Sequence, residues 1–148
     1  MVYTVGEVAK QLNVAPSTLR YYDKEGLFPF LERSGGGIRM FKDEDLSGLK
    51  IIECLKRTGM PIKDIKHFMD CCMEGDSTIN ERLSIIESQR DAVICQMKEL
   101  QEMLDMLNYK CWYYETAKKA ETCSVHDTIQ KENVPKEYHK YLTKKQNY

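Results

Sequence analysis

Polar side chains that could bind a nucleic acid recur at helical spacing between residues 16 and 25, and they are Ser17, Arg20, Tyr21 and Lys24. An arginine binds phosphate or the guanine edge with two hydrogen bonds, serine and lysine bind phosphate oxygens, and tyrosine adds a hydroxyl on a stacking ring. Leu19 and Tyr22 fall on another side, where they can face a core. A solvated surface helix shows the same pattern, so the spacing alone leaves both interpretations open.

The chain around these residues predicts two helices separated by a short turn. Pro16 fits the first turn of a helix and Gly26 fits the left-handed position past its end, so we expect a helix over residues 16–25. Before it, Thr4 and Glu7 have the spacing of a capping box, which predicts a first helix. The break between the two helices, about three residues, has the length of a helix-turn-helix corner.

The segment 30–41 has two short arms around three consecutive glycines, which predicts a β-hairpin wing. Arg33 and Arg39 lie on either side of its tip, where they could contact the DNA backbone and make binding dependent on salt. A flexible glycine loop with ordinary surface arginines is the alternative.

The order of these motifs resembles the winged-helix domain of the MerR family of bacterial transcription regulators. The matching motifs fall within residues 2–70 and are TVGEVA at 4–9, TLRYY at 18–22, GLFP at 26–29 and GIRMF at 37–41. Ile38 and Phe41 stand where many members have tyrosine, which removes a hydroxyl that could contact phosphate. The predicted DNA-binding residues are Ser17, Thr18, Arg20, Tyr21, Lys24, Arg33 and Arg39.

Charge and composition favour nucleic-acid binding by the N-terminal part. The chain has 148 residues, 42% of them hydrophobic, and a net charge of −1, which suits one small domain with an appendage. Residues 67–108 carry 3 Lys and Arg against 9 Asp and Glu, so clustered rather than overall positive charge would hold DNA. No apolar run could span a bilayer and no signal-peptide core is present, which predicts a cytoplasmic protein without a membrane partner.

Two further helices are predicted before a long one. Asp43 can cap a third helix that runs to Thr58 and buries Leu46, Leu49, Ile52 and Leu55. A fourth helix would pack on the third through Ile62, Ile65, Phe68 and Met69.

From residue 79 a coiled-coil seam is predicted, because its positions alternate steps of four and three. The seam residues are Ile79, Leu83, Ile86, Arg90, Val93, Met97, Leu100, Leu104, Leu107 and Cys111. A helix of about 50 Å with one apolar edge exposed is not stable alone, so a partner helix is implied.

The MerR resemblance implies a mainly α fold, with a winged helix-turn-helix DNA-binding domain followed by a long antiparallel coiled-coil helix. We expect a DNA-binding domain at 1–75, a dimerisation helix at 76–110, and an effector region with a tail at 111–148. The resemblance further implies a homodimer that binds a palindrome in the spacer of double-stranded promoter DNA. Once its effector binds, the dimer would deform the DNA so that RNA polymerase engages both promoter elements.

Cys54 is the first candidate for sensing the effector. Lys50 and Arg57 project on its side of the predicted helix, and nearby cations favour the reactive thiolate. A cysteine here also resembles the MerR subgroup that responds to reactive aldehydes and other thiol stress. A small buried residue is the alternative, since this is the commonest fate of a free cysteine.

Two other effectors are considered. Phe68, Trp112, Tyr113 and Tyr114 could line a pocket for a small apolar ligand, although aromatic clusters at a helix end more often pack. Cys71, Cys72, Cys111 and Cys123 are weak candidates for a metal site, without the cysteine that metal-responsive relatives place at the start of the dimer helix. No cofactor is predicted, with a metal left open.

Other functional classes fit the sequence less well. No phosphate-binding glycine loop, nucleophile elbow or HExxH pair is present, so we expect no enzyme. An architectural DNA-binding protein without an effector remains an alternative to a regulator.

Overall fold

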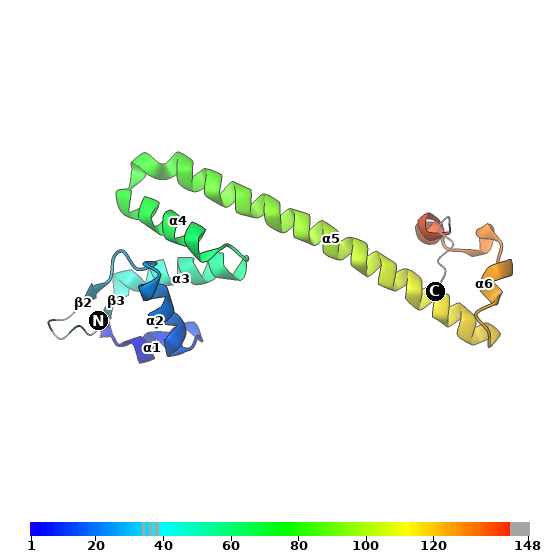
Figure 1. Cartoon of the computed structure of the whole chain (residues 1–148), viewed down its shortest axis with the longest axis horizontal. Helices are drawn as coiled ribbons and strands as arrows, with labels where there is room; N and C mark the ends of the chain where they lie inside the picture. Colours follow the sequence, from blue (N-terminus) through cyan, green and yellow to red (C-terminus); the bar gives the residue numbers. More distant parts are fainter. Residues whose placement is uncertain (34, 36, 38, 143–148) are drawn as a thin grey trace. The chain divides into compact units, whose positions relative to one another are not determined.

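A computed structural model describes residues 1–33, 35, 37 and 39–142, and its elements are labelled in Figure 1. The chain divides into two compact units, Met1–Ile94 and Cys95–Tyr148, and the long helix α5 (Ile79–Ala120) contributes to both. The predicted fold class is confirmed, because a winged helix-turn-helix at the N-terminus is followed by a long helix. None of the described helices combines the length and apolarity needed to cross a membrane.

The first unit begins with helix α1 (Val5–Leu12), which starts at the predicted capping box. The Thr4 amide donates to the Glu7 carboxylate at 2.7 Å, and the Glu7 amide points back to the Thr4 hydroxyl at 3.4 Å. Asn13 ends the helix in the left-handed conformation with φ 55°. A short polar residue tolerates this conformation better than most, so the turn after α1 is encoded locally.

Helix α2 (Pro16–Lys24) follows after the short turn that the sequence predicts. Pro16 occupies the first turn of the helix, and Gly26 adopts a φ of 77° just beyond the end. The helix ends one residue earlier than expected, because Glu25 is its C-cap. The two predicted helices and their corner are thus confirmed.

The wing is a β-hairpin of β2 (Glu32–Arg33) and β3 (Arg39–Lys42), as predicted. The sequence analysis did not anticipate β1 (Val2–Tyr3), which pairs antiparallel with β3 and gives the sheet order β1-β3-β2. A strand of two residues is too short to show the alternation by which strands are recognised. Residues 34, 36 and 38 at the tip, including Ile38, lie outside the described residues.

Helices α3 (Asp43–Arg57) and α4 (Ile62–Glu74) complete the first unit and pack on each other. The N-cap of α3 is Lys42, so the predicted cap at Asp43 is wrong. The Lys42 amide donates to the Asp45 carboxylate at 2.7 Å, whereas Asp43 accepts from the Tyr3 hydroxyl at 2.8 Å. Asp43 thus pairs with Tyr3 on β1, a residue far away in the sequence, and local spacing could not predict this contact.

One hydrophobic core joins these elements. Its buried residues are Val8, Ala9, Leu19, Tyr22, Leu27, Phe28, Phe41, Leu49, Ile52, Leu55, Met60, Ile65 and Met69. Leu46, Ile62 and Phe68 are partly buried against this core, as the predicted packing of the third and fourth helices requires. The position of α2 is therefore fixed by a hydrophobic core that α2 shares with α1, α3, α4 and the wing.

Helix α5 has 42 residues and continues past the expected boundary at residue 110. Its C-terminal turns are rich in alanine, glutamate and lysine, which favour a helix. It ends where Glu121 adopts φ 56° and the Thr122 amide donates to the Ala117 carbonyl at 3.1 Å.

The second unit is completed by the segment after α5. It forms α6 (Val125–Thr128) and the 3₁₀ turns η2 (Lys131–Asn133) and η3 (Lys136–Tyr141), and it buries Val134 to 3% exposure. The described part of the predicted tail, to residue 142, is folded.

Candidate nucleic-acid interface

The polar face of α2 is exposed while its apolar face is buried. Leu19 is 0% exposed and Tyr22 4%, so both lie in the core as predicted. Thr18 is partly exposed, and the exposed side chains of the helix include Ser17, Arg20, Tyr21 and Lys24. The structure thus gathers five of the seven predicted DNA-binding residues on one helix.

Tyr22 packs on the buried side of α2, where its hydroxyl interacts with Glu53 of α3. The pKa of Tyr22 is raised to about 12, mainly by burial and secondly by the Glu53 carboxylate. Glu53 is itself partly buried, and its Oε1 atom has no hydrogen-bond partner among the described residues. The neutral phenol is therefore the form that the fold stabilises beneath the exposed face.

An ion pair joins the wing to the end of α2. The Arg39 guanidinium on β3 places Nε 2.6 Å and Nη2 2.5 Å from Oδ2 of Asp23. The side chains of Asp23 and Arg39 are only 9% and 27% exposed, so salt screens this pair less than it screens a surface pair. The charge of Arg39 is engaged by the protein, and a phosphate contact by this residue stays a prediction.

Phe41, another residue of the wing, lies in the core. Phe41 is 0% exposed and packs edge-on against Phe28, with ring centroids 5.8 Å apart. A phenylalanine here therefore serves the core of the unit. The backbone of Arg33 pairs opposite Arg39 in the hairpin, while its side chain lies outside the described residues.

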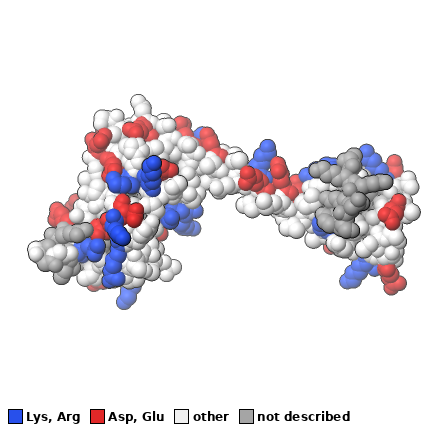
Figure 2. All heavy atoms as spheres, in the orientation of Figure 1, with Lys and Arg blue, Asp and Glu red and all other residues white. Residues whose placement is uncertain are grey.

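The surface charge agrees with the division expected from the sequence. Figure 2 shows Lys and Arg side chains on the visible face of the first unit and several acidic side chains along the middle of α5. The acidic stretch belongs to residues 67–108, which the sequence analysis set apart from DNA binding. On this face of the first unit, Lys and Arg side chains lie beside acidic ones, and Lys and Arg side chains are also visible on the second unit.

The predicted seam residues of α5 are largely uncovered. Their exposed members include Ile79, Leu83, Ile86, Met97, Leu100, Leu104 and Leu107, with exposed fractions between 38% and 65%. Val93 is partly buried, and Arg90 and Cys111 are exposed. Within the described residues, this chain does not bury its own seam.

The six cysteines differ in accessibility. Cys54 on α3 is exposed, so the alternative of a buried packing residue is wrong for it. Cys71 is buried and Cys72 partly buried in the first unit, whereas Cys111 and Cys123 are exposed in the second. Burial, followed by the charges of Glu81 and Glu74, raises the pKa of the Cys71 thiol.

The predicted aromatic pocket residues belong to different units. Phe68 packs against the core of the first unit. Trp112 and Tyr113 pack against the tail of the second unit, where Trp112 lies 5.8 Å from Tyr138 and Tyr113 stacks on His126 at 3.7 Å between centroids. Tyr114 is 61% exposed. These rings have partners within their own chain, and a ligand pocket around them stays a prediction.

Tyr109 and His126 are central to this aromatic cluster, and Tyr109 was not predicted as a functional residue. Tyr109 stacks on Tyr141 with centroids 4.7 Å apart, and His126 Nε2 lies 2.8 Å from the Tyr113 carbonyl oxygen. The tyrosines at 138 and 141 were a signal, since aromatic side chains seldom lie at i and i+3 in a solvated tail.

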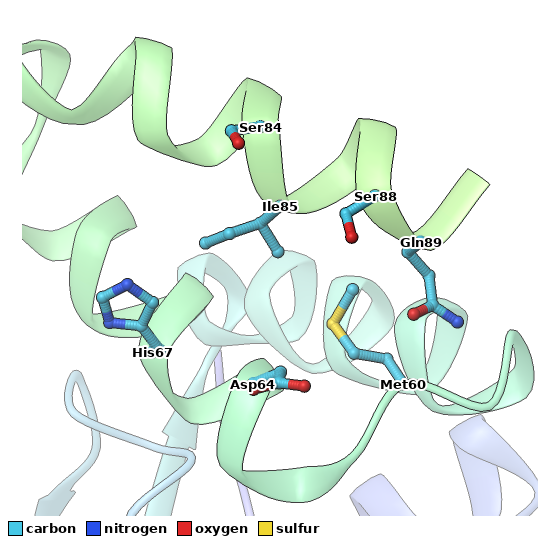
Figure 3. A pocket seen from close by; sticks show the side chains of 7 residues that line it. All are labelled: Met60, Asp64, His67, Ser84, Ile85, Ser88 and Gln89. Atoms are coloured by element: carbon cyan, nitrogen blue, oxygen red, sulfur yellow. The ribbon is translucent and has the colours of Figure 1, made fainter. Parts of the chain in front are cut away.

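A cleft of about 320 Å³ lies between α4 and α5 within the first unit (Figure 3). Its lining residues are Met60, Asp64, His67, Ser84, Ile85, Ser88 and Gln89. The Gln89 amide crosses to the Thr58 carbonyl oxygen at 2.9 Å and closes the end of the cleft toward α3. The sequence analysis did not identify this cleft, because its walls come from two helices.

Family models match most of the chain. The model described as MerR HTH family regulatory protein matches residues 3–71, and that described as MerR, DNA binding matches residues 46–109. An uncharacterized HTH-type transcriptional regulator of Haemophilus influenzae is 48% identical over 118 residues, which cover 80% of this chain and 87% of that protein.

Solved structures of MerR family regulators are also similar to this chain. A MerR family regulator lacking the sensor domain, HiNmlR, solved bound to promoter DNA, has 46% identity and a TM-score of 0.69, covering 84% of this chain and 99% of that one. A MerR family regulator from Bacillus thuringiensis has 47% identity and a TM-score of 0.65, covering 75% of this chain and 97% of that one. Regulators of this family are not enzymes, which agrees with the sequence analysis. With its helix-turn-helix, wing and long helix, the chain belongs to the MerR family of DNA-binding transcriptional regulators.

Proposed function

We propose that this regulator works as a homodimer, with α5 of each protomer paired antiparallel along the seam residues and one α2 presented at each end. The observation that carries this proposal is the long row of exposed apolar side chains on α5, in a chain that also exposes a polar recognition face on α2. Burying the row against a second copy would remove it from water, and two-fold symmetry suits a palindromic operator.

On DNA, α2 would enter the major groove with Arg20 reading a base edge or phosphate. Ser17, Thr18, Tyr21 and Lys24 would contact the adjacent backbone, with Arg33 of the wing beside them and Arg39 holding the wing against α2. The relative HiNmlR was solved on promoter DNA, which supports a promoter operator here. The dimer would sit in the promoter spacer in the cytoplasm and alter the DNA so that RNA polymerase engages both elements.

Arg20→Ala tests the recognition helix. Arg20 is exposed and off the core, so we expect operator affinity to fall roughly 10- to 100-fold, as the loss of one bidentate contact does, with the dimer intact. Gel-shift titration at fixed salt measures affinity and light scattering measures mass. Lys119→Ala removes the same charge from the far end of α5 and should leave binding unchanged. Equal affinities for wild type and Arg20→Ala would overturn the assignment.

We further propose that Cys54 senses thiol-reactive compounds such as aldehydes. Its side chain is exposed on α3, with Lys50 four residues before and Arg57 three residues after, both exposed. The thiolate sulfur would attack the carbonyl carbon, and the carbonyl oxygen would take up the π electrons and a proton to form a hemithioacetal. Because α3 lies within the DNA-binding unit, an adduct there could shift α2.

Adduct mapping by mass spectrometry tests this role. We expect Cys54 to be modified first among the cysteines, and Cys54→Ser to abolish the effect of aldehyde on the DNA footprint. Cys95→Ser, which changes another exposed cysteine, should respond as wild type does. A full response in Cys54→Ser, or modification elsewhere with Cys54 untouched, would exclude it as the sensor.

A further inference from the structure

Three side chains of different metal-binding chemistry converge where α4 passes into α5. His67 and Cys71 are four residues apart on one face of α4, and Glu81 lies in the first turn of α5. The Cys71 sulfur is 3.9 Å from Nε2 of His67, which is 2.7 Å from Oε1 of Glu81. One ligand atom from each residue lies within 4.8 Å of the other two.

We propose that His67, Cys71 and Glu81 bind a zinc ion, with the fourth coordination position left to water. Imidazole nitrogen, thiolate sulfur and carboxylate oxygen are the ligands that zinc takes in proteins. Around a tetrahedral zinc, neighbouring ligand atoms stand ~3.3–3.7 Å apart, given metal-ligand bonds of ~2.0–2.3 Å. The sulfur-nitrogen separation is close to this range already, and the imidazole and carboxylate must part slightly.

The backbone around the site is held in place, while two of the ligands can adjust. The Thr78 hydroxyl donates to the Cys71 carbonyl oxygen at 2.6 Å, and Arg82 donates to the Gly75 carbonyl oxygen at 3.1 Å. These bonds fix the turn that brings α5 back toward α4. The side chains of His67 and Glu81 are 55% and 54% exposed, so they are free to open around an ion.

The charge around the thiol suits a cation. The carboxylates of Glu81 and Glu74 both act electrostatically on the Cys71 thiol. The ion would replace the thiol proton, so each zinc bound releases one proton to solvent. Zinc would then link α4 to α5 across the turn, in a protomer with or without DNA.

One ligand of the site also borders the neighbouring cleft of about 320 Å³. His67 forms part of its wall (Figure 3), and Asp64 and Ser84 add polar atoms to the same wall. The site differs from the cysteine set considered in the sequence analysis, of which it uses only Cys71.

Cobalt titration of the full-length protein tests the site. We expect one Co²⁺ per chain with a sulfur-to-cobalt charge-transfer band from a single thiolate, and displacement by Zn²⁺. Cys71→Ser should remove the band. His67→Gln and Glu81→Gln, at exposed positions that do not threaten folding, should each weaken binding by at least ~10-fold, the loss that even an outer-shell partner causes.

Cys72→Ser is the matched control on the same helix and should bind cobalt as wild type does. No band in wild type would overturn the proposal. A band that survives in Cys71→Ser, or is lost in Cys72→Ser, would do the same, because the thiolate would then come from another residue. Circular dichroism of each variant checks that the helices are intact.

Discussion

Arg39 on the wing holds Asp23 at the end of α2, with Nη2 2.5 Å and Nε 2.6 Å from the same carboxylate oxygen. The two residues are sixteen positions apart and belong to the two elements that a winged helix lays on DNA. This ion pair sets the wing at a fixed distance from the recognition helix.

Breaking this pair should weaken DNA binding while leaving the exposed polar side chains of α2 unchanged. In Asp23→Asn, we expect lower operator affinity and a loss of unfolding free energy of about 1.5–3 kcal/mol, the range for hydrogen bonds to charged groups. Gel shifts and urea unfolding measure the two effects. Asp43→Asn breaks an exposed ion pair with the N-terminal amine, which solvent screens, so it should cost less stability than Asp23→Asn. Equal costs in the two variants would contradict the role given to Asp23.

Tyr22 should make the first unit sensitive to alkaline pH. Its pKa in the fold is about 12, above the ordinary value of 10, so folding favours the protonated phenol. The resulting stability is fully present below pH 10 and is lost as the pH rises through about 12. Urea unfolding across this interval measures it, as the difference between wild type and Tyr22→Phe. A difference that does not change with pH would show that the phenol has no raised pKa.

A charge in the seam should separate the proposed dimer. Leu104 is 50% exposed on one chain, and Leu104→Lys would place an ammonium where the second copy packs. We expect the molecular mass from light scattering to fall toward that of one chain. Glu102→Lys adds a lysine at a position outside the seam spacing and should keep the wild-type mass. A dimeric Leu104→Lys would place the interface elsewhere.

The aromatic cluster should report on the fold of the tail. Tyr141 stacks on Tyr109 at 4.7 Å, and Tyr109 stacks in turn on Trp112 at 6.1 Å. In Tyr141→Ala we expect Trp112, the one tryptophan of the chain, to become more exposed and to emit at longer wavelength. Tyr114→Ala removes an outer ring and should leave the emission unchanged. Identical spectra for Tyr141→Ala and wild type would contradict the packing of η3 on α5.

The sequence predicted the features whose signals are local. Capping at Thr4, the proline and glycine that bound α2, and the glycines of the wing each act within a few residues of the structure they encode. The exposed face of α2 followed from the same spacing, because a helix fixes which side chains share a side.

Long-range pairs could not be predicted in this way. Asp23 meets Arg39 across two elements, and His67 meets Glu81 across a turn between helices. Asp43 looked like a helix cap but accepts a hydrogen bond from Tyr3 on a strand too short to be recognised. No periodicity records such contacts, since each depends on how finished elements pack.

The alternation of strand β3 decides what a mutation in the wing means. Arg39 and Phe41 are two residues apart and so leave the strand on the same side, and Phe41 lies in the core. Arg39 therefore points back into the protein, toward Asp23. A loss of operator affinity in an Arg39 variant will therefore report on how firmly the wing is held against α2. The same loss of affinity in an Arg20 variant will report on a direct contact between α2 and DNA.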